Sequence, residues 1–405
     1  MNILLDFLTF RWQTGAGEYA RRVYRTLMET VINQGYDDIK FFALYDSVDG
    51  IAYENMCEGS IETRGVIYLD ASKMSLTELI KINKIDILFI ACAQYFEKQL
   101  DLPDVECRVV CVIHDLVHEE LFTNMMGYYF KFLNPKYQLG KRNVPARKYF
   151  LDTLKLAKWV IEVRKDHSLE SMLDMLHPTL ELICKNPKTQ IITVSEYTRN
   201  SLLYQYEVDP KRVKVLYSPE RYYSNSINEA ENEDLAELII SGKKYYLMLS
   251  ANRNTKNPHK AIQAFKRYAE LYDDTYFLVL GYNEKVFKNM YCLSYLSDSD
   301  LALALQHCYA LVYPTFFEGF GYPAIEAMHY GKPVLTSYAT SIPEIFGDAP
   351  IYFSPLYESE IFNALTKLSN DNYELYAKKS KLKYEQIKTK QESDLNQLIN
   401  IILNH

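Results

Sequence analysis

Short apolar runs alternate with segments of helical periodicity through the first half of the chain. The runs NILLDF, FFALY, IDILFIA, CRVVCVI and QIITVS have the length and the continuous apolar character of strands buried in a parallel sheet. The segment GEYARRVYRTLMETVINQG follows the first run with apolar residues at helical spacing, and Ser195 is placed to cap the helix SEYTRNSLLYQY. This alternation predicts a doubly wound α/β domain.

A second series of the same kind follows. It predicts strands at YYLMLSA, YFLVLGY, ALVYP and PVLTS, and helices at NPHKAIQAFKRYAELY, SDLALALQHC and residues 323–330. The polar, acidic segment between the two series indicates a linker, and the charged end of the chain indicates helix. We therefore predict a Rossmann-like domain at 1–217, a linker at 218–243, a second Rossmann-like domain at 244–375 and a helical tail at 376–405. Packing of the tail on the first domain is one arrangement, and ligands are expected in a cleft between the domains.

The composition is that of a globular protein, with 48% hydrophobic and 24% charged residues in a chain of 405. The net charge of −7 argues against a nucleic-acid-binding function, which normally requires a basic surface. The N-terminal MNILLDFLTF lacks a basic leader, and no run of about 18 apolar residues occurs. We expect no signal peptide, no membrane span and a cytoplasmic protein.

Seven scattered cysteines favour reduced thiols over a disulfide framework. Cys107, Cys111 and His114 share a short segment and resemble a set of metal ligands. The segment ECRVVCVIH is typical of a buried strand, however, in which the two sulfurs lie roughly 13 Å apart, too far for one zinc ion. We therefore predict that both cysteines are core thiols.

The segment FFEGFGYPAIEAMHYGKPVLTS, residues 316–337, combines a glycine loop with helix signals. Pro323 is typical of the first turn of a helix, and Gly331 of the position after a helix end. Gly319 and Gly321 then precede a helix N-terminus, where free N–H groups and the helix dipole favour an anion such as phosphate.

Two carboxylates flank this loop. Glu318 falls within it and Glu326 in about the first turn of the helix, from which a carboxylate can reach outward to hydroxyl groups. An anion site between two acceptors of hydroxyl hydrogen bonds fits a sugar nucleotide. A glycine-rich turn with two surface glutamates is the alternative.

The same segment resembles the signature of the family 4 retaining glycosyltransferases of the GT-B fold, or glycosyl transferases group 1. The similarity lies in Glu-Gly-Phe-Gly-Tyr-Pro, then Glu-Ala-Met after two residues, then Gly-Lys-Pro-Val. Five more segments resemble the family in the expected order: TGAGEY, VIHDL, ITVSEYTRNSLL, ANRNTKNPHKAIQAF and SIPEIFGDAP. The resemblance spans about residues 12–355. It implies two Rossmann-like domains that face each other across a cleft, with the first on the acceptor side.

The resemblance implies a role for each residue of the glycine loop and its flanks. Glu326 would hold the ribose hydroxyls of the donor nucleotide, and Glu318 would contact hydroxyls of the transferred sugar. Gly319, Phe320 and Gly321 would offer backbone donors to the sugar and the phosphates.

Other matching residues would act on the leaving group and the sugar. Lys256 and Arg253 would neutralise the diphosphate, Gly15 and Gly17 would let the first domain approach it, and His114 would contact the sugar near the reacting centre. A structural ion pair is the alternative for Lys256 and Arg253, and a core histidine for His114. Preorganised cations and N–H groups can stabilise the leaving group, so we expect no metal and no cofactor besides the donor.

Two further segments admit competing interpretations. Asp298-Ser-Asp300 imitates an Asp-x-Asp metal motif, but its place before a predicted helix favours capping. Residues 128–165 carry ten Lys or Arg against two acidic residues. They either dock on an anionic membrane surface or form a solvated helical face or a site for an anionic acceptor.

The combined prediction is a retaining, metal-independent glycosyltransferase of polysaccharide or cell-surface glycan synthesis. It would move a hexose from a nucleotide diphosphate sugar to a hydroxyl of a glycan or lipid-linked glycan. The TGAGEY and TKN segments resemble mannosyltransferase branches, so GDP-mannose is the first hypothesis for the donor, and UDP-linked sugars stay open. The alternatives are a sugar-nucleotide-binding or scaffold subunit without turnover, and a GT-B-shaped epimerase or phosphorylase.

Overall fold

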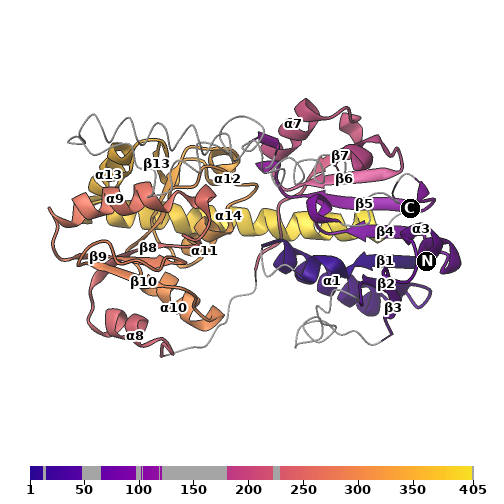
Figure 1. The fold of residues 1–405 in the computed structure, drawn as a ribbon, viewed down its shortest axis with the longest axis horizontal. Coiled ribbons are helices and arrows are strands. Elements are labelled where there is room, and N and C mark those ends of the chain that lie inside the picture. Colours follow the sequence, from indigo (N-terminus) through magenta and orange to yellow (C-terminus); the bar gives the residue numbers. More distant parts are fainter. Residues whose placement is uncertain are drawn as a thin grey trace, which may run out of the picture. The chain divides into compact units, whose positions relative to one another are not determined.

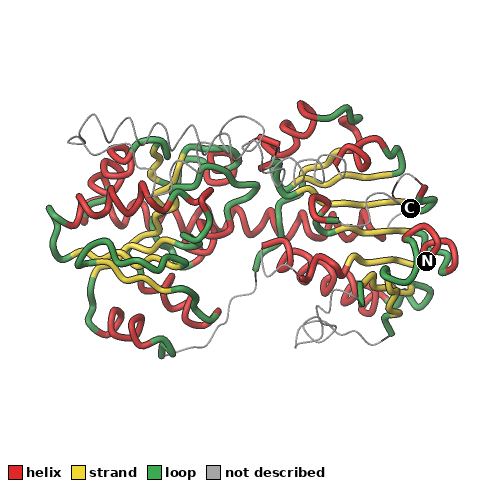
Figure 2. Tube along the Cα trace, in the orientation of Figure 1, coloured by secondary structure: helices red, strands yellow, loops and turns green. Residues whose placement is uncertain are grey.

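The computed structural model describes residues 1–11, 15–47, 65–96, 102, 104–117, 119–120, 180–221 and 229–403. The chain divides into two compact units. Unit 1 comprises Met1–Leu116, Ser168–Arg221 and Lys388–His405, and unit 2 comprises Val117–His167 and Tyr222–Ile387. Each unit contains its own parallel sheet (Figures 1 and 2).

The sheet of unit 1 has seven strands in the order β3-β2-β1-β4-β5-β6-β7, and every neighbouring pair is parallel. Leu4 of β1 pairs with Phe42 on one side and Leu88 on the other, so the strand order reverses between β1 and β4. This is the Rossmann arrangement, and the prediction of a doubly wound domain is confirmed. The strands are β1 Asn2–Asp6, β2 Lys40–Tyr45, β3 Ile67–Asp70, β4 Ile87–Ile90, β5 Arg108–Ile113, β6 Thr189–Thr193 and β7 Val213–Val215.

Helices of unit 1 begin where side chains can satisfy the first N–H groups. Ser195 accepts a hydrogen bond from the backbone N–H of Thr198, which confirms the predicted cap. Ser75 and Glu78 form a capping box, which explains a helix that was not predicted. The helices are α1 Gly15–Gln34, α3 Leu76–Ile82 and α7 Glu196–Gln205, with short 3-10 helices η1 Phe7–Arg11, η2 Ala93–Tyr95 and η6 Pro210–Arg212.

The sheet of unit 2 repeats the Rossmann arrangement with six parallel strands in the order β10-β9-β8-β11-β12-β13. Its order reverses between β8 and β11, which pair through Leu247 and Leu311. The second predicted α/β series is therefore confirmed. The strands are β8 Lys244–Met248, β9 Thr275–Leu280, β10 Met290–Leu293, β11 Ala310–Tyr313, β12 Val334–Ser337 and β13 Ile351–Phe353.

Helices α9 and α13 pack against each other beside this sheet (Figure 1). Phe265 of α9 and Ile361 of α13 share one buried core with Tyr246 of β8, because their apolar faces repeat at helical spacing. The helices are α8 Glu233–Ile240, α9 Pro258–Ala269, α10 Asp298–His307, α11 Tyr322–His329, α12 Ile342–Phe346, α13 Glu358–Lys367 and α14 Asn370–Leu403, with the 3-10 helix η7 Asn254–Lys256.

Two predicted segments differ from the structure. The linker assigned to 218–243 contains α8, whose start is capped by Asn232 and whose apolar contacts come from Leu235 and Leu238. Because only two of its eight residues are buried, the apolar periodicity is too weak for this helix to be recognised from the sequence. The tail assigned to 376–405 belongs to a single helix, α14, that begins at residue 370, and its residues from Lys388 onward group with unit 1.

The segment of α14 in unit 1 is hydrogen-bonded to residues 217 and 218. The carboxylate of Asp394 accepts the backbone N–H of Tyr217 at 2.7 Å, and the amide of Gln391 donates to the carbonyl of Ser218 at 2.6 Å. Lys390 pairs with Asp394 at 2.9 Å. These bonds attach the end of α14 to the segment that follows β7.

Cys107 and Cys111 are both buried, as predicted for core thiols. Burial raises the pKa of Cys107 to about 12, so its thiol stays protonated. The cysteines of the described residues are all free.

Among the helices that the structure describes, none has both the length and the apolar character needed to cross a bilayer. The basic stretch 128–165 lies outside the described residues.

Candidate active site

The loops that follow β8 and β11 bring the predicted donor-side residues of unit 2 together. Arg253 and Lys256 follow β8, and Glu318 follows β11. These strands flank the point where the strand order reverses, and their carboxyl ends lie at the same edge of the sheet. In open α/β sheets this position is the usual ligand-binding site.

Lys256 and Glu318 form a buried ion pair through Nζ and Oε1. Only 7% of the lysine side chain and 13% of the glutamate side chain are exposed. The ammonium also donates to the Tyr313 hydroxyl at 3.0 Å, and Thr315 Oγ1 donates to the same carboxylate oxygen at 2.7 Å. We call Lys256, Tyr313, Thr315 and Glu318 the charged cluster. The ion pair that the sequence left open for Lys256 is therefore present, with Glu318 as its partner.

Tyr313 was not predicted as a site residue. Its side chain is buried at the end of β11, and burial followed by the charge of Glu318 raises its pKa well above the ordinary value. Glu326 raises the pKa further and Arg253 lowers it, so both charges lie within electrostatic range of the hydroxyl. A tyrosine in ALVYP is indistinguishable from a core residue by pattern. The one feature of the sequence that could have identified Tyr313 as a site residue is its position at the carboxyl end of a central strand.

Gly321 occupies a position that only glycine fits. Its φ is +93°, and an added Cβ would lie 2.9 Å from Ile342 Cδ1 and 3.1 Å from Phe346 Cε2. It directly precedes α11, and Pro323 lies in the first turn as predicted. Gly331, at φ +67°, ends the helix with a backbone hydrogen bond to Met328.

Glu326 lies deeper than predicted. It is the fifth residue of α11, in the second turn, and only 4% of it is exposed. The helix begins one residue earlier than predicted, and the alternative of a surface glutamate does not hold for Glu326, because its side chain is buried. Burial raises the pKa values of Tyr313 and Tyr330, and the charge of Glu326 raises both further, so this carboxylate lies within electrostatic range of both hydroxyls.

The backbone of the glycine loop is anchored by the segment after β12. Glu318 exchanges two hydrogen bonds with the Thr340 hydroxyl, and its carbonyl accepts another from the Ser341 hydroxyl. Gly319 and Phe320 are buried next to it. Neither hydroxyl was predicted to take part in the site.

His114 in unit 1 directly follows β5, and the hydrogen bond of its ring defines which nitrogen carries the proton. Its Nε2 lies 2.9 Å from the carbonyl oxygen of Ala91, and because a carbonyl only accepts, the proton is on Nε2. The ring packs edge-on against Tyr19, with centroids 4.8 Å apart. Burial lowers the pKa of His114 to about 4, so the imidazole is neutral at pH 7 and its Nδ1 is an acceptor.

Gly15 and Gly17 lie in the first turn of α1, so the predicted helix begins two residues earlier than its sequence pattern indicated. Thr14, from the same motif, lies outside the described residues. Tyr19 of this helix contacts His114, so the helix start and the histidine share one edge of the unit 1 sheet. A helix N-terminus offers backbone N–H groups without partners inside the helix, so this position is compatible with the role that the resemblance implies for both glycines.

The segment Asp298-Ser-Asp300 forms the first turn of α10, and the N-cap is Ser297, one residue before the segment in which capping was predicted. Ser297 Oγ accepts the N–H of Asp300 at 3.2 Å, and the Asp300 carboxylate accepts the N–H groups of Glu231 and Asn232 at 2.9 and 3.0 Å. Asp300 therefore joins the starts of α10 and α8. In the part of the chain that the structure describes, no three His, Cys, Asp or Glu side chains are grouped to hold a metal ion.

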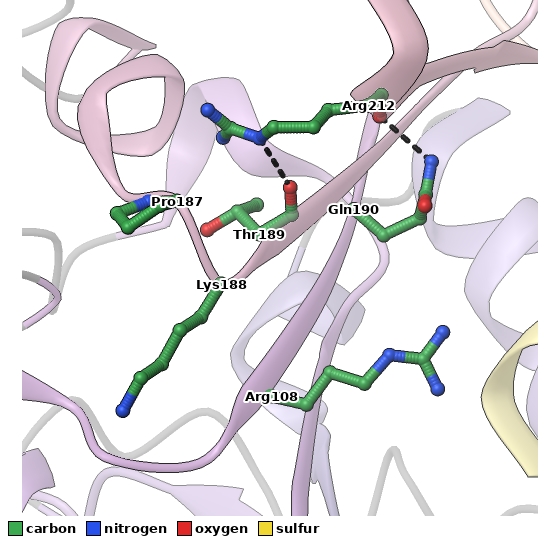
Figure 3. Close-up of a pocket in the computed structure, with 6 residues that line it drawn as sticks. All are labelled: Arg108, Pro187, Lys188, Thr189, Gln190 and Arg212. Atoms are coloured by element: carbon green, nitrogen blue, oxygen red, sulfur yellow. Dashed lines mark hydrogen bonds between the residues drawn. The ribbon is translucent and has the colours of Figure 1, made fainter. Parts of the chain in front are cut away.

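A hollow of about 320 Å³ lies at the opposite edge of the unit 1 sheet, at the amino ends of β5 and β6 (Figure 3). Two of its basic side chains, Arg212 and Lys188, already bind backbone carbonyls. Arg212 donates to Thr189 and Cys184 at 3.0 and 2.8 Å, and Lys188 donates to Glu106 at 2.9 Å. These cations support the chain locally, and the hollow contains none of the predicted site residues. Its lining is Arg108, Pro187, Lys188, Thr189, Gln190 and Arg212.

Comparison with known proteins finds a family match over part of the second half of the chain. Residues 230–386 match the model for glycosyl transferases group 1, which confirms the resemblance in this segment. The chain is 27% identical over 179 residues to the O-antigen chain mannosyltransferase RfbU of Salmonella typhimurium, and 29% identical over 181 residues to O-antigen chain mannosyltransferase B of Escherichia coli. Each match covers 41% of this chain and 46% or 47% of the relative, so the chain spans about half the length of the curated relatives that it matches.

Solved structures show the same fold across the whole chain. WaaG, a glycosyltransferase involved in lipopolysaccharide biosynthesis, aligns over 100% of both chains with a TM-score of 0.62 and 14% identity. HepE from Anabaena, solved in complex with UDP and glucose, aligns over 99% of both chains with a TM-score of 0.60 and 13% identity. The chain has the GT-B architecture of two Rossmann-like domains.

Proposed function

We propose that this protein is a glycosyltransferase that moves a hexose from a nucleotide diphosphate sugar to a hydroxyl of a glycan or lipid-linked glycan. The observation that carries the proposal is the buried Lys256–Glu318 pair beside the glycine loop, at the ligand-binding edge of unit 2. Buried charges are costly, and an ion pair is weak evidence of stabilisation alone. Its position at a ligand-binding edge favours a functional reason for retaining it.

The donor would occupy the carboxyl edge of the unit 2 sheet. Glu326 would accept hydrogen bonds from the ribose hydroxyls, and backbone N–H groups of the glycine loop at the N-terminus of α11 would bind phosphate oxygens. Mannose is the first hypothesis for the sugar, because the matched relatives carry the name mannosyltransferase. The complex of HepE with UDP shows that another protein of this fold binds a uridine nucleotide, so GDP and UDP are both candidate donor nucleotides.

The charged cluster would act on the leaving group and the sugar. Once the donor diphosphate approaches Lys256, the ammonium is shared between the phosphate and Glu318, and Glu318 becomes available to sugar hydroxyls. Lys256 and Arg253 would then stabilise the charge that develops on the diphosphate as the glycosyl bond breaks. In unit 1, the neutral His114 would offer Nδ1 as an acceptor to a sugar hydroxyl.

Retention of the anomeric configuration and independence from metal ions are parts of this proposal. Lys256, Arg253 and the N-terminus of α11 would supply the positive potential that a metal ion supplies elsewhere. Activity should therefore persist in EDTA. Complete loss that Mn²⁺ restores would refute the metal-independent part, and a product of inverted configuration, seen by NMR, would refute retention.

A thermal-shift and calorimetry screen with GDP, UDP, dTDP and ADP tests donor binding, since a ligand that binds only the folded protein raises its melting temperature. Turnover is then measured with the sugar derivatives of the nucleotide that binds, using the release of nucleoside diphosphate. We expect one nucleotide to bind and its sugar derivative to be consumed. Binding without turnover on every donor and acceptor would favour a sugar-nucleotide-binding subunit, and conversion of the sugar without transfer would favour an epimerase.

We further propose that the protein works at the cytoplasmic face of a membrane, docked through the basic stretch 128–165. The support is compositional, because clustered Lys and Arg are attracted to anionic lipids. Flotation with anionic liposomes should occur at low salt and decrease as salt screens the attraction. Absence of flotation at low salt would refute the docking.

A further inference from the structure

The segment after β12 holds both backbone polar groups of Glu318. Thr340 Oγ1 accepts the N–H of Glu318 at 3.0 Å and donates to its carbonyl oxygen at 3.0 Å. Ser341 Oγ donates to the same carbonyl at 2.8 Å, and Ser341 is fully buried. Two hydroxyls therefore restrain the backbone of one residue, whose side chain is restrained separately by the charged cluster.

Thr340 adopts an unfavourable backbone conformation. Its φ is +47°, in the left-handed region, where a β-branched residue is a clear outlier. Such strain persists only where the surroundings determine the conformation, and it concentrates at functional sites. A glycine would relieve it but would lack the hydroxyl that bonds to Glu318.

The restraint extends to the next residue. A peptide group is planar, and in the trans form its N–H points opposite to its C=O. Because the Glu318 carbonyl is directed at Thr340 and Ser341, the N–H of Gly319 points away from that segment. The same two hydroxyls therefore set the backbone from which the Glu318 side chain extends and the direction of the following N–H.

We propose that Thr340 and Ser341 are positioning residues for the donor sugar, which orient the Glu318 carboxylate and the Gly319 N–H before the donor binds. This inference rests on the proposed function. Donors and acceptors that are oriented in advance need no rearrangement in the transition state. Loss of the hydroxyls should therefore reduce turnover while nucleotide affinity, assigned mainly to Glu326 and the helix N-terminus, changes little.

Thr340→Val is the central variant, because valine keeps the shape and the β-branch of threonine and removes only the hydroxyl. Thr340→Ser keeps the hydroxyl and serves as the rescue, and Ser341→Ala is the second test. Thr275→Val is the matched control, since this buried hydroxyl donates to the Tyr272 carbonyl at 2.6 Å at the amino end of β9, the edge away from the site. Melting temperature, nucleotide affinity, kcat and KM are measured for each variant with the donor that the wild type consumes.

We expect Thr340→Val to lower kcat on the order of tenfold to a hundredfold. Its nucleotide affinity should stay within about twofold of the wild type, and Thr340→Ser should restore most of kcat. Thr275→Val should lower the melting temperature and leave kcat unchanged. A Thr340→Val enzyme with the kcat of the Thr275→Val control, or a serine variant as impaired as the valine variant, would overturn the inference and leave the proposed function standing. A wild type that neither binds a nucleotide nor consumes a donor would refute both.

Discussion

The charged cluster should behave as one energetic unit in unfolding experiments. Lys256→Met leaves the Glu318 carboxylate 13% exposed, with hydrogen bonds from Thr315 and Tyr313 but without its counter-ion. Removing one partner of a buried pair costs about 3 to 5 kcal/mol. We expect about 3 kcal/mol here, at the lower end, because the two hydroxyls and the partial exposure still solvate the carboxylate.

Glu318→Gln should cost a similar amount, since it leaves the Lys256 ammonium 7% exposed beside the Tyr313 hydroxyl. The double variant removes both charges and with them the penalty of an unpaired buried ion. Its loss should be about 2 to 3 kcal/mol smaller than the sum of the two single losses.

Hydrogen exchange at increasing urea, followed in peptides that cover β11, reports the opening free energy of unit 2 independently of unit 1. The exposed pair Arg267–Glu270, with side chains 65% and 50% exposed, is the matched control and should show coupling below about 0.5 kcal/mol. Two results would refute the reasoning, because they would show that solvent screens the Lys256–Glu318 pair. The first is single variants whose opening free energies lie within about 1 kcal/mol of the wild type. The second is a double variant whose loss of opening free energy equals the sum of the two single losses.

Three further predictions concern other parts of the site. Glu326→Gln should weaken nucleotide binding by about 1 to 3 kcal/mol in calorimetry, because one of the two buried acceptor oxygens becomes an NH2 donor and the charge is removed, and unchanged affinity would contradict the ribose role. Gly321→Ala should destabilise unit 2 by more than Gly331→Ala does, since both have positive φ but only Gly321 faces Ile342 and Phe346; equal melting temperatures would exclude the steric argument. Burial lowers the pKa of His114 from 6.5 in the unfolded chain to about 4, so the unfolded state binds more protons between these values and stability falls as pH falls through this window. His114→Gln should flatten that slope in melting curves, and an unchanged slope would contradict the assignment.

The parallel sheets were predictable because strands buried on both faces leave unbroken apolar runs such as those of β5 and β9. Strands β3, β7, β10 and β13 were missed, because each has only three or four residues and partly exposed positions. The glycine loop was predictable because Gly321, Pro323 and Gly331 each satisfy a local backbone requirement.

The contacts of the site were harder to predict. Pairing between Lys256 and Glu318 depends on the neighbourhood of β8 and β11, which the order along the chain does not reveal. The burial of Glu326 depends on which face of α11 packs against β11 and β12, which the sequence of one short helix does not reveal. Thr340 was missed because its φ of +47° contradicts the preference of its own residue type.

Unit 1 cannot complete its folding until the end of helix α14 has been synthesised, because residues from Lys388 onward belong to it. The partners of Tyr217 and Ser218 are Asp394 and Gln391, which leave the ribosome only after all of unit 2. The intervening stretch of about 170 residues takes roughly 10 to 30 s to translate. Leu398 and Ile402 are buried in the complete protein but have not yet been synthesised during that interval. The apolar surface of unit 1 that they later cover is therefore exposed on the nascent first half. Chaperone capture of ribosome-bound chains should therefore be strongest while unit 2 is being made.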